Sequence, residues 1–201
     1  MPIRRKTARE CYEYFRGHLA QLFASALTGN YPLLFRRDQR DPDARVTLTM
    51  ADASGLAAIP IETSRHGRLF ASFAQTLSVV AEEGGTHRLV TLQYWYRIQA
   101  DPGAREPALM RWEYERTLAE DRNHCRHHIQ QRGVLPFGAR PLDLDKAHVP
   151  TGWVTIEEIL RFLIVDLGVA PPCGNGWPKV LEESERAFYE DFSDHLYVPP
   201  H

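Results

Sequence analysis

The chain has 201 residues, of which 43% are hydrophobic and 25% are charged, and its formal net charge at neutral pH is −2. This length suits a single domain over residues 1–201 with a real core, and the balanced charge excludes a bulk electrostatic attraction to nucleic acid or membranes. No apolar run is long enough to span a bilayer, and the three scattered cysteines without CxxC spacing favour a reducing compartment, so we expect a cytoplasmic protein with no membrane partner.

A helix is predicted within residues 1–29. Thr7 and Glu10 have the spacing of a capping box, in which both side chains bond backbone N–H groups at a helix start. Apolar residues follow at helical spacing as far as Ala26, and Gly29 is a suitable terminator. This amphipathic pattern favours packing on a core, and a partner-binding helix is the alternative.

The next part of the chain is predicted to open an antiparallel sheet. Residues 30–44 contain prolines and a mixed-charge run, which are typical of a loop, and residues 45–50 alternate as a short strand does. A brief strand is expected near residues 59–62. Residues 68–80 fit both a strand and a helical stripe, and we choose a strand because the glycines at 84 and 85 suit a turn into the next strand.

Residues 89–131 are the centre of the predicted fold. Residues 89–99 alternate strictly, residues 109–117 alternate after a turn signal, and residues 123–131 follow a polar loop. We interpret them as three consecutive antiparallel strands whose polar side gathers Arg, Glu and His, so that the sheet covers residues 45–131. In the first strand one side carries Val90, Leu92, Tyr94, Tyr96 and Ile98, and the other carries Thr91, Gln93, Trp95, Arg97 and Gln99.

Two helices are predicted over residues 155–193. Thr155 and Glu158 form a second capping box, and apolar residues at helical spacing lead to Gly168. A last helix is expected from Pro178 to about residue 192. The fold class is therefore predicted to be α+β, with an antiparallel sheet of four to six strands packed by a C-terminal amphipathic helix and with helices at both chain ends.

Histidine and arginine on the three central strands are the candidate catalytic residues. On an extended strand His124 and His128 share one side, and histidine donates and accepts protons near neutral pH. A ribonuclease without a metal needs a base for the 2′-hydroxyl, an acid for the leaving 5′-oxygen and a cation for the phosphorane. Arg97 or Arg111 can supply that cation, because guanidinium matches phosphate geometry.

Three further residues complete the candidate site. Glu113 either orients a histidine or acts as a base beside Arg111, and a surface ladder of opposite charges is the structural alternative. Arg126 shares the side of His128 and is a candidate for binding nucleic acid. Trp95 is the aromatic residue that falls on the polar side of its strand, where it could stack on a base.

A metal site is a weaker hypothesis. His124, Cys125 and His128 could supply ligands, with Cys173, His148 or a carboxylate closing the site. The sequence has no zinc-type pairing such as CxxC…HxxxH or HExxH. We therefore expect no metal and no cofactor.

The order of these motifs resembles the TumE-like bacterial toxin family, formerly a domain of unknown function. The motifs are "LQYWYRIQ", "LMRWEYER", "NHCRHHIQ" and the capped helix "TIEEILRFL". The family has an aromatic strand, an "RYDN"-type strand, an "H-x-H" strand and a closing amphipathic helix, and the resemblance covers about residues 68–167. The matching positions are Tyr94–Ile98, Arg111–Glu115, and His124 or Arg126 through His128.

The resemblance implies a cytosolic prokaryotic toxin that acts on RNA and has a cognate antitoxin as its partner. The chain departs from the family where the Asp-Asn pair is replaced by Glu113-Tyr114-Glu115, so we expect its site chemistry to differ from that of the family. The rival hypothesis is a non-enzymatic interaction or accessory subunit of a bacterial defence cassette, which binds a protein partner through the strand face. A zinc-dependent module is the third.

Overall fold

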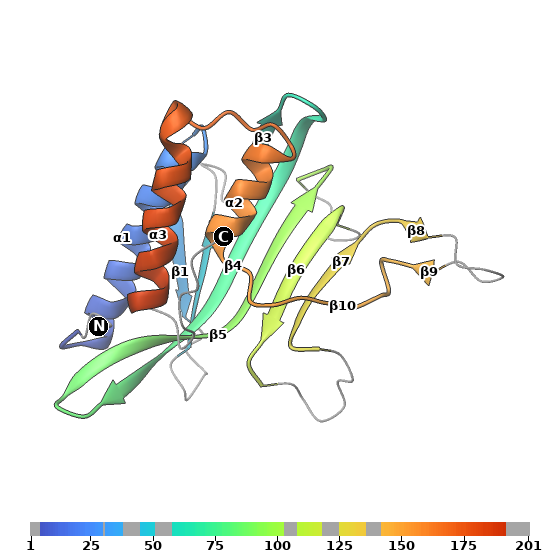
Figure 1. Cartoon of the computed structure of the whole chain (residues 1–201). Coiled ribbons are helices and arrows are strands. Elements are labelled where there is room, and N and C mark those ends of the chain that lie inside the picture. Colours follow the sequence, from blue (N-terminus) through green and yellow to red (C-terminus); the bar gives the residue numbers. More distant parts are fainter. Residues whose placement is uncertain are drawn as a thin grey trace.

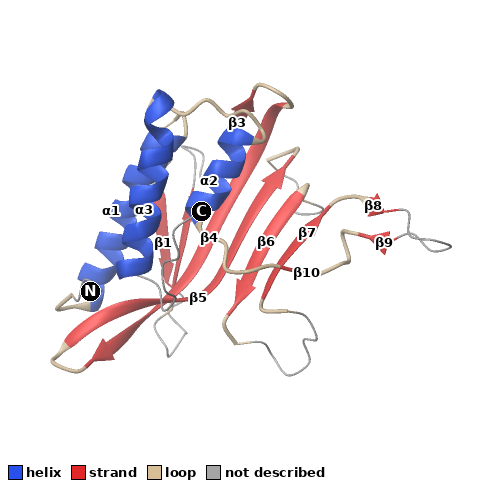
Figure 2. Cartoon of the chain, viewed as in Figure 1, coloured by secondary structure: helices blue, strands red, loops and turns tan. Residues whose placement is uncertain are grey.

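The computed structural model describes residues 5–29, 31–37, 45–50, 58–102, 108–117, 125–135 and 142–191. It is an α+β structure in which three helices lie on one face of an eight-stranded antiparallel sheet (Figure 1). This confirms the predicted fold class, with a helix near each end of the chain (Figure 2). In the described part of the chain, no helix is long and apolar enough to cross a membrane.

The sheet follows the order β1-β2-β4-β5-β6-β7-β10, and β3 pairs with β4 beside β2. Two further strands, β8 and β9, form a separate two-stranded sheet. All the pairings are antiparallel, so neighbouring strands can be joined by local turns rather than by crossover helices. The strands are β1 (Leu33–Arg37), β2 (Val46–Met50), β3 (Ala58–Thr63), β4 (Gly67–Glu82), β5 (Thr86–Gln99), β6 (Met110–Glu115), β7 (His127–Gln131), β8 (Val134–Leu135), β9 (Leu142–Asp143) and β10 (Val149–Pro150).

The long β4–β5 hairpin is the frame of the sheet. Its turn contains Gly84 and Gly85 at φ 85° and 73°, a backbone region that glycine adopts without steric cost. The strand prediction for residues 68–80 is confirmed, because they lie inside β4. Side chains alternate along each strand, so the pairing of β5 with β4 sets which residues of β5 face the helices.

A β-bulge in β5 changes the predicted alternation. Thr76 pairs with Gln93 but Leu77 pairs with Thr91, so Leu92 is the extra residue. Beyond the bulge Leu89, and not Val90, joins the core cluster that also holds Tyr94 and Tyr96. The prediction that Val90 lies on the side of Tyr94 is therefore wrong, since one inserted residue reverses the phase.

The three helices cover the apolar face of the sheet. They are α1 (Ala8–Ala26), α2 (Ile156–Val165) and α3 (Trp177–Asp191), and both predicted capping boxes are formed, at Thr7 and at Thr155. Each large apolar side chain buried in this layer stabilises the fold by roughly 1.5–3 kcal/mol. The buried residues include Phe15, Leu19 and Phe23 of α1, Leu160 and Leu163 of α2, Leu181 and Phe188 of α3, and Phe73, Tyr94 and Tyr96 of the sheet.

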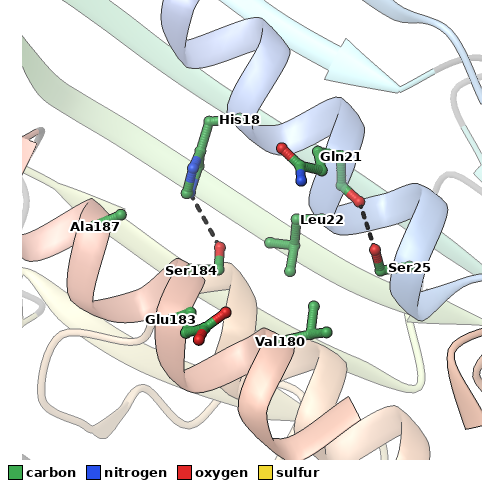
Figure 3. Close-up of a pocket in the computed structure, with 8 residues that line it drawn as sticks. All are labelled: His18, Gln21, Leu22, Ser25, Val180, Glu183, Ser184 and Ala187. Carbon is green, nitrogen blue, oxygen red and sulfur yellow. Dashed lines mark hydrogen bonds between the residues drawn. The ribbon is translucent and has the colours of Figure 1, made fainter. Parts of the chain in front are cut away.

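A polar contact joins α1 to α3 within this layer (Figure 3). The Ser184 hydroxyl donates to the buried Glu157 carboxylate at 2.6 Å and lies 3.0 Å from Nε2 of His18. A hollow of about 240 Å³ opens between the two helices beside it. Because a buried carboxylate is costly unless it is hydrogen-bonded, this contact stabilises the docked position of α3.

Two segments predicted as loops contain strands. Strand β1 lies within residues 30–44, and the sheet therefore exceeds the four to six strands expected. Leu33 is buried and Phe35 packs against Tyr12 of α1, while Leu34 between them is exposed. Only two apolar residues face inward, which is too short an alternation to predict a strand. The short strands β8, β9 and β10 fall in the loop-rich stretch of residues 132–152 for the same reason.

Candidate functional site

The candidate site lies on the face of the sheet that the helices leave uncovered, over β5, β6 and β7; we call it the polar face. Tyr94 and Tyr96 point into the core, so the alternating Trp95 and Arg97 point to the polar face. The strand register sets two rows of side chains there. Trp95 lies opposite Glu113, which lies opposite His128, and Arg97 lies opposite Arg111, which lies opposite Gln130. The three predicted strands thus bring Arg, Glu and His together.

Glu113 is the centre of this cluster. Its Oε2 is 3.2 Å from Nε2 of His128, and its Oε1 is 3.3 Å from Nε of Arg111 and 3.9 Å from an Nη of Arg97. Burial raises the pKa of Glu113, but the hydrogen bond to His128 and the charges of Arg111, His128 and Arg97 outweigh it and hold the pKa below its usual value. Glu113 is therefore a carboxylate at neutral pH and contacts a histidine, and its role in orienting that histidine stays a prediction.

His128 is enclosed by two hydrogen-bond acceptors. Its Nδ1 lies 3.0 Å from the carbonyl oxygen of Cys125, and its Nε2 faces the Glu113 carboxylate. A neutral imidazole donates from only one nitrogen, whereas an imidazolium donates from both. Both ring nitrogens of His128 therefore lie against oxygen acceptors. With 3% of the side chain exposed, His128 is also closed to a substrate in this arrangement.

Two arginines face each other directly across neighbouring strands. Arg97 pairs with Arg111 in the register, and like charges in that position destabilise a sheet. Glu113 compensates both, and an Nη of Arg111 also donates to Oε1 of Gln130. Glu115, the next residue on this face of β6, lies opposite Gln93 of β5. Arg97 and Arg111 thus bring two guanidinium groups to the carboxylate of Glu113, which His128 also contacts.

Trp95 lies on the polar face as predicted, half-exposed beside the arginine pair. The guanidinium carbon of Arg97 is 4.7 Å from the centre of a Trp95 ring, a cation–π contact that holds both groups. The neighbouring aromatic residues Tyr94, Tyr96 and Trp112 are buried. Trp95 is therefore the aromatic group of this hairpin that a ligand on the polar face can reach.

Two predicted residues do not join the described cluster. His124 lies outside the described residues, so its expected pairing with His128 stays a prediction. Arg126 stands one residue before β7 with an exposed side chain, and its carbonyl oxygen accepts a hydrogen bond from the Glu115 N–H at 3.1 Å.

A second imidazole that the sequence did not assign to catalysis lies at the site. Pairing of β10 with β7 brings His148 beside His128, with ring centroids 4.6 Å apart at 62°. His148 is exposed. From the sequence, His148 is a candidate only for metal binding, because nothing in the spacing of residues 132–152 predicts that β10 pairs with β7.

The described residues do not form a metal-binding group. No cluster of three or more His, Cys, Asp or Glu side chains in this part of the chain could hold an ion. Cys125 has its thiol 3.8 Å from the carbonyl oxygen of His148. Cys173, the other proposed ligand, is bonded through its backbone to Ser25 of α1, on the helical side of the molecule.

The arrangement can bind an anion and stack on a ring, since it combines paired guanidinium groups with a half-exposed indole. Searches found no match to the chain among family models, curated proteins or solved structures. The functional argument therefore depends on the chemistry of this cluster.

Proposed function

We propose that the polar face binds single-stranded RNA and cleaves it without a metal ion, and that the protein is a cytoplasmic toxin of a prokaryotic toxin–antitoxin or defence cassette. The observation that carries the proposal is the direct opposition of Arg97 and Arg111. Such a pair weakens the free sheet and is relieved when a phosphate binds between the two groups. The resemblance to the TumE-like family points to the same class of target.

Each residue of the cluster has a role in this proposal. Arg97 and Arg111 hold the phosphate oxygens and stabilise the charge of the phosphorane. Trp95 stacks on a base next to that phosphate, which selects an unpaired strand because stacked duplex bases are not accessible. Glu113 and His128 are positioning residues. Glu113 contacts both His128 and Arg111, so the pair holds the side chain of Arg111 in place.

The direct test is RNA binding and cleavage by the purified protein with a chelator present. We expect wild type to bind and shorten a single-stranded RNA, and Arg97→Ala and Arg111→Ala each to lose most of both activities. Arg9→Ala, an exposed arginine on α1, is the matched control and should behave as wild type. Wild type that neither binds nor cleaves RNA contradicts the proposal, and cleavage that stops with chelator contradicts the metal-independent mechanism.

The toxin role has its own test in cells. Expression of wild type in a heterologous bacterium should arrest growth and degrade total RNA, whereas Arg111→Ala should be harmless at equal protein level. Co-expression of the neighbouring gene product should restore growth if that product is the antitoxin. Equal, harmless expression of both forms would refute the toxin role.

A non-enzymatic subunit is the second candidate, and the enclosure of His128 favours it. A histidine with both nitrogens hydrogen-bonded and 3% of its side chain exposed suits a rigid binding surface as well as a catalytic one. In that case the polar face binds an acidic protein partner. Co-purification with a neighbouring gene product, abolished by Arg97→Ala and without any RNA cleavage, would support this alternative.

A further inference from the structure

We infer that His148 is the general base of this proposed RNA cleavage, and that Gln130 holds it neutral for that task. The inference rests on the proposed function, and its test separates the two. Among the described residues of the cluster, the other proton acceptors are already engaged, because Glu113 contacts two arginines and His128, and His128 is enclosed.

The amide of Gln130 fixes the protonation of His148. Arg111 has only donors, so the oxygen of the Gln130 amide must face it. The amide nitrogen then faces the Asp145 carbonyl oxygen at 3.3 Å and Nε2 of His148 at 3.4 Å. A donor amide requires a lone pair on Nε2, which is the neutral ring with its proton on Nδ1.

His128 and His148 are adjacent imidazoles with different surroundings. The ring of His128 lies between two oxygen acceptors, whereas the ring of His148, centred 4.6 Å away, has its Nε2 against the amide nitrogen of Gln130. The backbone carbonyl oxygen of Asp145, three residues before His148, accepts a hydrogen bond from the same amide nitrogen. The two rings therefore meet different hydrogen-bonding groups, and the amide nitrogen marks His148 as the acceptor.

The position of His148 suits contact with a substrate. Its side chain is exposed, whereas that of His128 is closed. Arg111 and His148 contact opposite ends of the same Gln130 amide, so the phosphate-binding cation and the proton acceptor share one anchor. The distance of 3.4 Å between the Gln130 amide nitrogen and Nε2 of His148 is long for a hydrogen bond. The 2′-hydroxyl of a bound RNA can therefore replace the amide as the donor to Nε2.

The step balances with water as the only other reactant. His148 Nε2 takes the proton of the 2′-hydroxyl, and the 2′-oxygen bonds to phosphorus as the bond from phosphorus to the 5′-oxygen breaks. The 5′-oxygen leaves as an alcohol with a proton from water, and His148 returns its proton to solvent. The products are a 2′,3′-cyclic phosphate and a 5′-hydroxyl end.

The experiment compares single-turnover cleavage of a single-stranded RNA over a range of pH by wild type, His148→Ala and His66→Ala. His66 is an exposed histidine in the β3–β4 turn and serves as the control. We expect His148→Ala to bind RNA as wild type does but to cleave at least about 100-fold more slowly, and added imidazole to restore part of the rate. Gln130→Glu places an acceptor against Nε2, so it should move the acid limb of the pH–rate profile to higher pH.

The outcomes separate the base from the site. Normal cleavage by His148→Ala overturns the assignment of His148 as the base. The assignment is also overturned if His148→Ala cleaves slowly, loses RNA binding and is not rescued by imidazole. Both outcomes leave the proposed function standing. An intact pH profile in Gln130→Glu overturns the role of Gln130. Wild type that binds no RNA and leaves it uncleaved overturns both proposals.

Discussion

Replacement of Glu113 by Gln tests the electrostatic design of the polar face most directly. The change keeps the shape of the side chain but removes the negative charge that contacts His128, Arg111 and Arg97 at 3.2, 3.3 and 3.9 Å. At an effective dielectric constant of about 20, each contact is worth at most about 4–5 kcal/mol of Coulomb energy. The side chain is 27% exposed and its own desolvation opposes the gain. We therefore expect a net loss of about 2–3 kcal/mol in the free energy of unfolding.

The pH dependence of that loss is the diagnostic part. The pKa of Glu113 is lower in the folded protein than the unfolded value of 4.5, so the folded state binds this proton more weakly. The stabilisation is complete above the unfolded value and disappears as pH falls through the folded pKa. We expect urea unfolding from neutral pH down to about pH 3 to show that the difference in free energy of unfolding between wild type and Glu113→Gln decreases in acid.

The control is Glu62→Gln, which removes a carboxylate from a solvent-exposed ion pair with Arg68. Such pairs contribute about 0–1 kcal/mol, so the control should unfold almost as wild type does at every pH. A Glu113→Gln protein as stable as wild type at neutral pH, or a gap that does not change with pH, would refute the ionised Glu113 at the centre of the cluster.

Three other substitutions test separate parts of the argument. Trp95→Ala should weaken binding of single-stranded RNA by about 1–3 kcal/mol in a filter-binding titration, with little change in the urea midpoint. Ser184→Ala deprives buried Glu157 of its 2.6 Å donor and should cost about 1–3 kcal/mol, whereas Ser25→Ala, whose hydroxyl bonds its own helix, should cost less; equal losses would argue against the polar contact. Burial first, then the charges of Glu157 and Glu158, raise the pKa of Glu185, so its ionisation weakens the fold as pH rises above the unfolded value of 4.5. Glu185→Gln should therefore gain stability over wild type in urea unfolding at neutral pH, and a neutral or negative effect would contradict this.

The sequence predicted the parts of the fold that depend on local periodicity. Both capping boxes start helices where Thr7 and Thr155 indicate, and residues 68–80 and 89–99 lie in the paired strands β4 and β5. These features follow from a period of 3.6 or 2 and from side chains that satisfy their own backbone. They need no knowledge of distant parts of the chain.

The features that the sequence missed depend on pairing between distant segments. The bulge at Leu92 is visible only in the register of β5 against β4, and it reverses the side on which Val90 lies. His148 reaches the site because β10 pairs with β7, and a two-residue strand leaves no periodic signal. Arg97, Arg111, Glu113 and His128 could be placed on one face, but their protonation could not, since it depends on which acceptors meet the ring nitrogens.

The charges on the polar face do not form a simple ladder of opposite signs. A ladder would alternate signs across strands, whereas Arg97 faces Arg111 and both arginines contact Glu113. A fold selected for stability alone would remove one of these cations, because like charges opposite each other cost free energy without adding to the core. Retaining them is favourable when an anion occupies the face for part of the time, since a ligand that binds only the folded state offsets the repulsion. The direct opposition of Arg97 and Arg111 therefore supports the proposed anionic ligand more strongly than the presence of arginine by itself.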